Sequence, residues 1–504
     1  MEMIASSNAT EGLVRGKNAE RVALRTLDRD YRYGALERAS AEVAAHLRQV
    51  GLQMGDRVLL VADNSFFWVA SYLGTLRAGM ISVPLPVSIN PQDFEYVLQT
   101  TEARFGFIQA RFASLNKDRL RPVQIVSDCK VENFPAARSF TDLSQAGDSA
   151  ENLADVSRDD LAALMFTSGS TGKPHGVMVS HGNIMANTHS IIEYLGLTED
   201  DRIMTVLPFH YCFGTSLLHT HLSVGASLVL DQRFMYPDKI LDRMIETECT
   251  GFAGVPSHFQ ILLRKSSIRT RTFPHLRYVQ QAGGHLAPSF IQELREVLPT
   301  TKIFVMYGQT EATARLSYVP PERLDEKVES IGKPIPGVTL RVVDESGRDA
   351  KPGEIGEIVA EGANVTQGYW RASEETAISF RNGKLYTGDI GRIDDEGFFY
   401  LVGRNKDFIK CGGKRISCRQ IEDQIMEMGD LLEAAVVGVP DEVLGEAVKA
   451  FVVPRAATDG IKDRVMLFCR GRLPLPLVPK EVVVLDALPR NSSGKILKHE
   501  LKDP

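Results

Sequence analysis

The sequence predicts an α/β protein with a large N-terminal domain of parallel sheets and crossover helices, a β-rich subdomain and a small α+β C-terminal domain. Three observations predict this class. Short apolar strands alternate with helical patterns through residues 57–306. After residue 332 the strands are separated instead by Gly, Pro and Asp turns. A length of 504 residues exceeds what one hydrophobic core supports, so at least two domains are expected.

The overall composition excludes several classes of function. Hydrophobic residues make up 43% and charged residues 24% of the chain, which is typical of globular proteins. A net charge of −6 gives no general attraction to nucleic acid or to anionic lipid. The longest apolar stretch, residues 66–85, contains Arg77 and Gly79, so membrane insertion is not expected.

The first residues and the cysteines indicate a cytoplasmic protein. Residues 1–4 show neither the basic segment nor the long apolar core of a signal peptide. The six cysteines are scattered along the chain, which suits reduced thiols. Cys411 and Cys418 lack a nearby histidine or second cysteine pair, so we do not interpret them as a zinc site.

A strand–helix alternation dominates the predicted large domain. Residues 1–30 are expected to form a polar arm or a first helix, and further helices are expected at 91–101 and, with an amphipathic pattern, at 65–78. The strands predicted from apolar runs are residues 57–62, 81–85, 105–108, 203–207, 227–230, 251–255, 278–281 and 302–306. This alternation predicts parallel sheets with crossover helices.

The change of pattern near residue 332 predicts two further units. Residues 403–407 are polar and prone to turn, so we predict that they separate a large domain, residues 1–404, from a small domain, residues 405–504. In the small domain the Ser417-x-x-Gln420 spacing fits a capping box at a helix start. The remaining predicted elements are strands at 338–343, 356–359, 397–402, 434–439, 448–453 and 481–485, and a helix at 462–470.

A loop rich in small hydroxyl residues follows an apolar strand at residues 161–166. Its members are Thr167, Ser168, Gly169, Ser170, Thr171, Gly172 and Lys173. Their backbone N–H groups, hydroxyls and single ammonium can bind a polyphosphate without any negative charge to repel it. The glycines are too close together for a Walker loop, and Pro174 follows the lysine. A flexible linker is the alternative, but the strand at residues 177–179 favours a hairpin-like loop.

Six short motifs occur in a fixed order along the chain. They are residues 167–176, 207–210, 307–311, 386–389, 403–415 and 489–501. Together they resemble the adenylate-forming superfamily, which includes acyl-CoA synthetases, stand-alone adenylation domains and firefly luciferase. The resemblance covers residues 59–501 and is closest to acyl-CoA ligases. It implies ATP-dependent activation of a carboxylic acid as an acyl-AMP, followed by transfer of the acyl group to a thiol.

The resemblance implies a nucleotide site built from distant segments. Asp389 can accept hydrogen bonds from both ribose hydroxyls, and Tyr307, at the end of a predicted strand, can stack on adenine. Glu311 is the expected Mg²⁺ ligand, because a hard cation prefers carboxylate and phosphate oxygens. The other nucleotide-binding residues that the resemblance implies are Thr167 with the loop that follows it, Gly283, Gly284, Gly308, Gln309, Thr310 and Arg404.

The catalytic residues that the resemblance implies are Lys495, His210 and Thr310. Lys495, in the run Asn-Ser-Ser-Gly-Lys, would bridge the substrate carboxylate and the α-phosphate, to which Thr310 would also donate. His210 stands where amino-acid-activating relatives carry an aspartate, which disfavours an α-amino acid. In isolation, Lys495 would be interpreted as a solvated lysine and His210 as a core histidine.

A second half-reaction requires a mobile small domain, because the thiol must reach a carbonyl that Lys495 covers. Lys406 matches the family's hinge position. After rotation of the domain, the loop that contains Gly412, Gly413 and Arg415 would line the tunnel for the thiol.

The expected ligands are therefore ATP, Mg²⁺, CoA and a small carboxylic acid with an aliphatic or aryl tail. A close alternative is a stand-alone adenylation enzyme that loads the phosphopantetheine of an acyl carrier protein. A luciferase-like oxidase has no separate support in the sequence. A nucleotide-binding regulatory protein is disfavoured because Lys495, Glu311 and Asp389 are all present.

Overall fold

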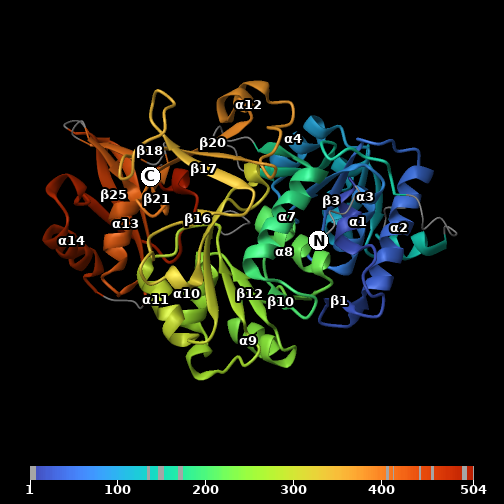
Figure 1. Cartoon of the computed structure of the whole chain (residues 1–504), viewed down its shortest axis with the longest axis horizontal. Helices are drawn as coiled ribbons and strands as arrows, with labels where there is room; N and C mark the ends of the chain where they lie inside the picture. Colours follow the sequence, from blue (N-terminus) through green and yellow to red (C-terminus); the bar gives the residue numbers. More distant parts are fainter. Residues whose placement is uncertain are drawn as a thin grey trace.

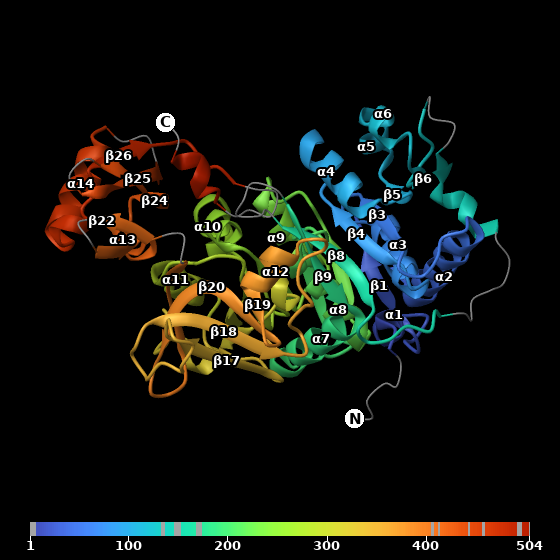
Figure 2. The same cartoon turned by 90° about the horizontal axis from the view of Figure 1, so that it is seen from above.

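The computed structural model describes residues 7–132, 137–145, 153–167, 174–404, 408–411, 414–441, 444–455, 459–490 and 496–502. Within this part of the chain, four sheets and the helices around them make up the fold (Figure 1). The C-terminal unit lies at one end of the molecule and the first sheet lies at the other (Figure 2). The α/β class, the parallel sheets with crossover helices and the later β-rich unit are as predicted.

The first sheet is parallel except at one edge. Its strand order is β7-β6-β5-β3-β4-β8-β9. The pair β8–β9 is antiparallel, with Thr167 opposite His175, so the predicted hairpin around the hydroxyl-rich loop is confirmed. The strands are β3 (Arg57–Val61), β4 (Ile81–Leu85), β5 (Phe105–Ile108), β6 (Gln124–Ser127), β7 (Arg138–Ser139), β8 (Leu161–Thr167) and β9 (His175–Ser180), and the helices α2 (Tyr33–Gln49), α3 (Phe66–Arg77), α4 (Pro91–Thr101), α5 (Ala110–Leu115) and α6 (Lys117–Leu120) connect or cover them.

The second sheet contains a run of parallel strands from the middle of the chain. Its order is β16-β15-β14-β13-β12-β10-β11-β1-β2. The strands are β10 (Arg202–Thr205), β11 (Ser227–Leu230), β12 (Gly251–Gly254), β13 (Tyr278–Gln281), β14 (Lys302–Tyr307), β15 (Ser317–Val319), β16 (Lys333–Pro334), β1 (Val22–Arg25) and β2 (Asp30–Arg32). The associated helices are α1 (Ala9–Val14), α7 (His181–Leu195), α8 (Cys212–Val224), α9 (Pro237–Glu246), α10 (Pro256–Lys265) and α11 (Pro288–Val297). Helices α7 and α8 lie between the two sheets (Figure 1).

Two sequence-based expectations for the N-terminal half are corrected by the structure. Residues 1–30 hold more than an arm or a helix, since β1 pairs in parallel with β11 about two hundred residues later. The apolar core of β1 is too short to stand out in the sequence. Helix α3 is not amphipathic but buried on all sides, because α2 packs on it closely at Gly74 while Tyr72 reaches α8 on another side.

The last two sheets carry the C-terminal third of the chain. The third sheet is antiparallel and contains β17 (Val338–Val343), β18 (Gly356–Gly362), β19 (Phe380–Arg381), β20 (Lys384–Ile393) and β21 (Phe399–Arg404), with α12 (Ser373–Ser379) beside it. The fourth sheet contains β22 (Phe408–Cys411), β23 (Lys414–Ser417), β24 (Leu431–Asp441), β25 (Gly445–Pro454) and β26 (Glu481–Val484), with α13 (Cys418–Met426) and α14 (Ile461–Arg472). Ser417 caps α13 by accepting a hydrogen bond from the Gln420 N–H, which is one half of the predicted capping box.

The described residues show the state of the cysteines and whether any described helix could cross a membrane. All six cysteines are free thiols, and Cys411 and Cys418 are buried among the apolar side chains of the fourth sheet and α13. No described helix combines the length and the apolar character that crossing a bilayer would require.

Three histidines of the core make the stability of the fold depend on pH. Burial lowers the pKa of His181 and His221 to about 4 and that of His219 to about 3. In the unfolded chain their pKa is near 6.5, so below that pH the unfolded state binds more protons than the native state. We expect the melting temperature to fall steadily between pH 7.5 and pH 5, where most carboxylates are still ionised.

The measurement is thermal unfolding followed by circular dichroism across this pH range. His219→Gln, which keeps a hydrogen-bonding group opposite the Tyr72 hydroxyl, should flatten the dependence on pH. A melting temperature that stays constant from pH 7.5 to pH 5 would contradict the neutral, buried state of these imidazoles.

Candidate active site

The carboxyl ends of four neighbouring parallel strands define the candidate site. Strands β10, β12, β13 and β14 run in parallel, so their carboxyl ends meet at one edge of the second sheet. Loops at this edge carry His210, Val255 and Gly283, and Tyr307 is the last residue of β14. Open α/β sheets bind ligands at this edge, where the loops after the strands form a crevice.

Tyr307 and Arg404 both bind the carboxylate of Asp389. The Tyr307 hydroxyl donates to Asp389 Oδ2 at 2.6 Å, and Arg404 Nε donates to Oδ1 at 2.9 Å. Asp389 on β20 lies opposite Arg404 on β21, and its side chain is almost fully buried. A carboxylate has about four acceptor positions, so each oxygen retains one for a further donor. This arrangement holds a carboxylate acceptor at the edge of the second sheet.

The turn after β14 directs two side chains to different sides of the site. Residue 308 must be glycine, because a Cβ there would lie 2.0 Å from the Ala314 carbonyl oxygen. Gln309 leads into the short helix η3 (Thr310–Ala312), where the Thr310 hydroxyl contacts Cys212 Sγ at 3.4 Å. Glu311 instead accepts a hydrogen bond from the Tyr369 hydroxyl at 2.9 Å.

The surroundings of Glu311 fit a magnesium ion that arrives with a nucleotide. The described residues contain no group of three or more His, Cys, Asp or Glu side chains that could hold a metal alone. Mg²⁺ typically binds through one or two carboxylates and completes its shell with substrate phosphates and water. A single carboxylate positioned by a tyrosine therefore matches this mode of binding, and burial together with Glu311 raises the pKa of Tyr369, which keeps its hydroxyl protonated.

His210 lies in a rigid loop between β10 and α8. Asn64 fixes this loop, since its Oδ1 accepts from the Phe209 N–H at 2.8 Å and its Nδ2 donates to the Leu207 carbonyl at 2.8 Å. His210 Nε2 is buried and has no hydrogen-bond partner among the described residues. Burial lowers the pKa of His210 to about 4, so the imidazole is neutral near pH 7. It can hydrogen-bond to a ligand but supplies no positive charge.

The glycine pair after β13 lies against the loops of its neighbours. Gly283 has φ of +82°, and a Cβ there would lie 2.9 Å from Val255 Cγ1 and 3.3 Å from the Tyr211 hydroxyl oxygen. A side chain at this position would therefore strain the backbone and crowd the pocket. The Gly284 carbonyl accepts from Gln281 Nε2 at 2.9 Å, which fixes the turn.

His285 connects this edge to the C-terminal unit. Its Nε2 lies 2.6 Å from Asp423 Oδ1, and its Nδ1 lies 2.6 Å from Arg419 Nη2. A neutral imidazole with its proton on Nε2 satisfies both contacts, because Arg419 can only donate. Burial and the Arg419 charge lower the pKa of His285, which favours this neutral form.

Several predicted site residues lie outside the described residues. These are Ser168, Gly169, Ser170, Thr171, Gly172, Lys173, Lys406, Gly412, Gly413, Lys495 and the side chain of Arg415. The structure does bring together Tyr307, Gly308, Gln309, Thr310, Glu311, Asp389 and Arg404. It places His210, Gly283 and Gly284 in the loops that follow β10 and β13, and Thr167 opposite His175, whose ring contacts Tyr369.

Sequence reasoning missed three residues that shape this site. Asn64 fixes the His210 loop, Tyr369 binds Glu311, and Arg315 is buried against the Phe213 ring. None of the three gave a signal in the sequence, and a lone arginine such as Arg315 is usually exposed.

Comparisons with known proteins agree with this geometry. A sequence model of the AMP-binding enzyme family matches residues 14–370, and a model of the AMP-binding enzyme C-terminal domain matches residues 420–495. The chain is 30% identical to indoleacetate–CoA ligase from Aromatoleum aromaticum, over 100% of this chain and 98% of the relative.

Two solved structures are similar over almost the whole chain. ATP-bound MatB from Rhodopseudomonas palustris gives a TM-score of 0.89 at 30% identity, with 99% of this chain and 98% of that chain covered. The o-succinylbenzoate CoA synthetase MenE from Bacillus subtilis, in complex with the acyl-adenylate OSB-AMP, gives a TM-score of 0.87 at 28% identity and the same coverage.

Proposed function

Because the chain belongs to the AMP-binding enzyme family, we propose that it is an acid–CoA ligase that forms AMP. In the first half-reaction a carboxylate oxygen attacks the α-phosphorus of ATP, and an acyl-AMP and pyrophosphate result. In the second, the thiol of CoA attacks the acyl carbonyl, and an acyl-CoA and AMP are released. The observation that carries the proposal is the Tyr307–Asp389–Arg404 cluster beside Thr310 and Glu311.

Each part of the nucleotide has a complementary group in this proposal. The ribose hydroxyls donate to the two open acceptor positions of Asp389, with Arg404 beside them. Adenine lies between the face of Tyr307 and the glycine pair Gly283–Gly284. The phosphates bind the loop from Thr167 to Lys173, whose donors carry no opposing charge. Glu311 would hold Mg²⁺, which neutralises phosphate charge when bound.

The carboxylate and the α-phosphate are both anionic, so the protein must supply donors and a cation between them. Thr310 supplies a hydroxyl at the carboxyl edge of the sheet. Lys495 supplies the cation in this proposal. His210 remains neutral and orients the acid by hydrogen bonding, because its buried Nε2 otherwise lacks a partner among the described residues. The surrounding Cys212, Phe213 and Val255 are buried and suit an aliphatic or aryl tail.

The second half-reaction uses a rotation of residues 405–504 against residues 1–404. Every described strand up to β21 belongs to the first three sheets, and every strand from β22 onward belongs to the fourth. Lys406 lies in the short segment between these two groups of strands. After rotation, Gly412, Gly413 and Arg415 would line the path of the thiol. The His285 contact with α13 would have to break during this motion.

A proline at the hinge should separate the two half-reactions. Lys406→Pro locks φ near −65° and removes one N–H, so we expect acyl-AMP formation to fall less than threefold or so while thioester formation falls by roughly tenfold or more. Pyrophosphate exchange measures the first step, and consumption of supplied acyl-AMP with CoA measures the second. Lys406→Ala, which leaves φ free, is the control. Equal loss of both activities in the proline variant would contradict the hinge.

The thiol acceptor is CoA in this proposal. We place the reaction in the cytoplasm, where both CoA and ATP are available. A phosphopantetheinylated carrier protein is the other possible acceptor. The test is to incubate the protein with ATP, Mg²⁺ and a panel of acids, with CoA or with a loaded carrier, and to identify the products by mass spectrometry. We expect AMP, pyrophosphate and an acyl-CoA. Release of ADP, or no product from any acid, would contradict the proposed function.

A further inference from the structure

Arg315 is the feature of this site that the proposed chemistry does not yet use. It lies between η3 and β15, and only 1% of its surface is exposed. Its carbonyl accepts hydrogen bonds from Asn364 Nδ2 at 2.9 Å and from Asn187 Nδ2 at 3.2 Å. Thr313, with φ of 66°, donates to the Asn364 carbonyl at 2.7 Å. These contacts hold the backbone of the loop in one position.

The guanidinium of Arg315 is buried without an anionic partner. Its Cζ lies 4.0 Å from the centroid of the Phe213 ring. Its Nε and Nη2 are buried and have no hydrogen-bond partner among the described residues. No carboxylate in the described part of the chain forms an ion pair with it, and the groups that favour its charge most are Tyr194, Cys212 and Tyr211.

Those three neighbours do not balance a positive charge. Burial raises the pKa of Tyr194 to about 12, and burial also raises the pKa of Tyr211 and of the Cys212 thiol, so all three remain uncharged at neutral pH. An arginine side chain does not lose its proton in proteins. A buried, unpaired cation is costly, and the attraction to an aromatic face offsets only part of that cost. The site is therefore complementary to an anion.

The position of Arg315 distinguishes among the anions that the reaction brings. Glu311 faces Tyr369 and, beside it, His175 of the β9 hairpin, which marks the phosphate side of the turn. Arg315 contacts Phe213 of α8 instead, next to Cys212, which the Thr310 hydroxyl touches. In the proposed function Cys212 and Phe213 surround the tail of the acid, so Arg315 lies on the side of the turn where the acid binds. An anion that binds Arg315 therefore belongs to the acid.

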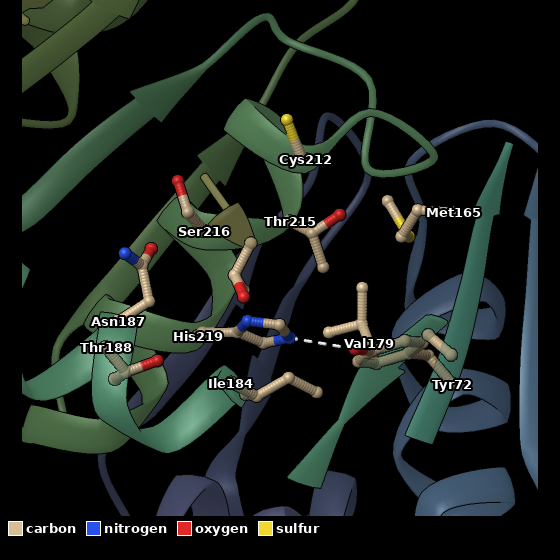
Figure 3. Close-up of a pocket in the computed structure, with 12 residues that line it drawn as sticks. Tyr72, Met165, Val179, Ile184, Asn187, Thr188, Cys212, Thr215, Ser216 and His219 are labelled. Carbon is tan, nitrogen blue, oxygen red and sulfur yellow. Dashed lines mark hydrogen bonds between the residues drawn. The ribbon is translucent and has the colours of Figure 1, made fainter. Parts of the chain in front are cut away.

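A small cavity lies next to Cys212, which the Thr310 hydroxyl touches. Cys212, Thr215, Asn187 and Thr313 line a cavity of about 20 Å³ on the inner face of α8 (Figure 3). Such a volume holds about one water molecule. Figure 3 also shows that His219 points away from Cys212 toward Tyr72, to which it is hydrogen-bonded at 2.9 Å, so it does not supply a ligand for the acid.

We propose that Arg315 is a specificity-determining residue that binds the second carboxylate of a dicarboxylic acid. The inference rests on the proposed function, because it names the class of acid that the ligase activates. The relatives do not decide this point, since indoleacetate carries one carboxylate and o-succinylbenzoate carries two. The planar guanidinium offers two parallel N–H donors that match a carboxylate.

The test compares dicarboxylic acids with monocarboxylic acids in which a methyl group replaces one carboxyl group. The pairs are malonate with propanoate, succinate with butanoate, glutarate with pentanoate, and phthalate with 2-methylbenzoate. ATP–pyrophosphate exchange gives kcat/KM for each acid with the full-length protein. We expect at least one dicarboxylate to exceed its partner by about 30-fold or more, because losing one member of a buried charged pair is costly.

Variants of Arg315 separate recognition from folding. In Arg315→Met, which replaces the charge with an apolar chain of similar length, this preference should fall by about 30-fold, mainly through a higher KM for the dicarboxylate. The melting temperature should not fall, since removal of an unpaired buried charge is often neutral or stabilising. Arg315→Lys keeps the charge but loses the planar fork, so it should retain part of the preference.

The outcomes distinguish the two proposals. Monocarboxylates activated as well as their dicarboxylate partners, or a preference that Arg315→Met leaves unchanged, would overturn the role of Arg315 while the ligase function stands. A loss of folding in Arg315→Met with no preference in the wild-type protein would make Arg315 structural only. Pyrophosphate exchange with none of the acids would instead count against the ligase function itself.

Discussion

Replacing Lys495 with alanine is expected to lower the rate of acyl-adenylate formation by about 10²–10³, the typical cost of losing one aimed charge or donor at a developing oxyanion. The reason is electrostatic. A carboxylate and a triphosphate repel each other, and no other cation in this proposal is assigned to the space between the acid and the α-phosphate. ATP–pyrophosphate exchange, without CoA, measures this step directly.

The design of this experiment separates catalysis from folding. Lys502→Ala, an exposed lysine of the same C-terminal segment, is the matched control and should exchange pyrophosphate at the wild-type rate. Lys495→Ala supplied with a synthetic acyl-AMP and CoA should still form the thioester, because that step begins after the lysine has acted. Exchange within about twofold of wild type in Lys495→Ala would remove Lys495 from the mechanism.

Changing Glu311 to glutamine should reduce pyrophosphate exchange by about 10²-fold, since metal stabilisation of phosphate charge is worth several kcal/mol and each tenfold costs about 1.4 kcal/mol. The amide oxygen can still accept from the Tyr369 hydroxyl, so the loop should keep its position. The loss is therefore one of charge. The Mg²⁺ concentration that gives half the maximal rate should rise.

The matched control for this change is Glu322→Gln, on the exposed face of the short helix η4 (Pro321–Arg323) close by in sequence. It should leave both the rate and the Mg²⁺ dependence unaltered. If Glu311→Gln kept the wild-type Mg²⁺ dependence, the metal would be bound elsewhere and Glu311 would only position the loop.

Elements with clear start and stop signals could be predicted from the sequence almost to the residue. Helix α4 begins at Pro91 after the cap Asn90, whose side chain accepts from the Asp93 N–H, and strand β5 is an apolar run of four buried residues. In both cases local signals and tertiary packing agree. Strands β1 and β2 could not be predicted, because β1 pairs with β11, which lies far along the chain, the edge strand β2 pairs only with β1, and both sequences are short.

In the site, too, contacts between residues far apart in the sequence could not be predicted. Motifs pointed to Asp389 and Tyr307 separately, but the hydrogen bond that joins them spans 82 residues and depends on how two sheets pack. Arg315 could not be recognised, because one arginine between two strands is ordinary in a sequence. Only its burial against Phe213, with two N–H groups lacking partners among the described residues, marks it as unusual.

The most direct test of the account follows oxygen atoms through the reaction. The protein is incubated with ATP, Mg²⁺, CoA and an accepted acid whose carboxylate is labelled with ¹⁸O, and the products are analysed by mass spectrometry. If the carboxylate attacks the α-phosphorus, AMP must carry one ¹⁸O and pyrophosphate none. Label in inorganic phosphate together with ADP, or unlabelled AMP beside a labelled thioester, would contradict an acyl-AMP intermediate and with it the proposed function.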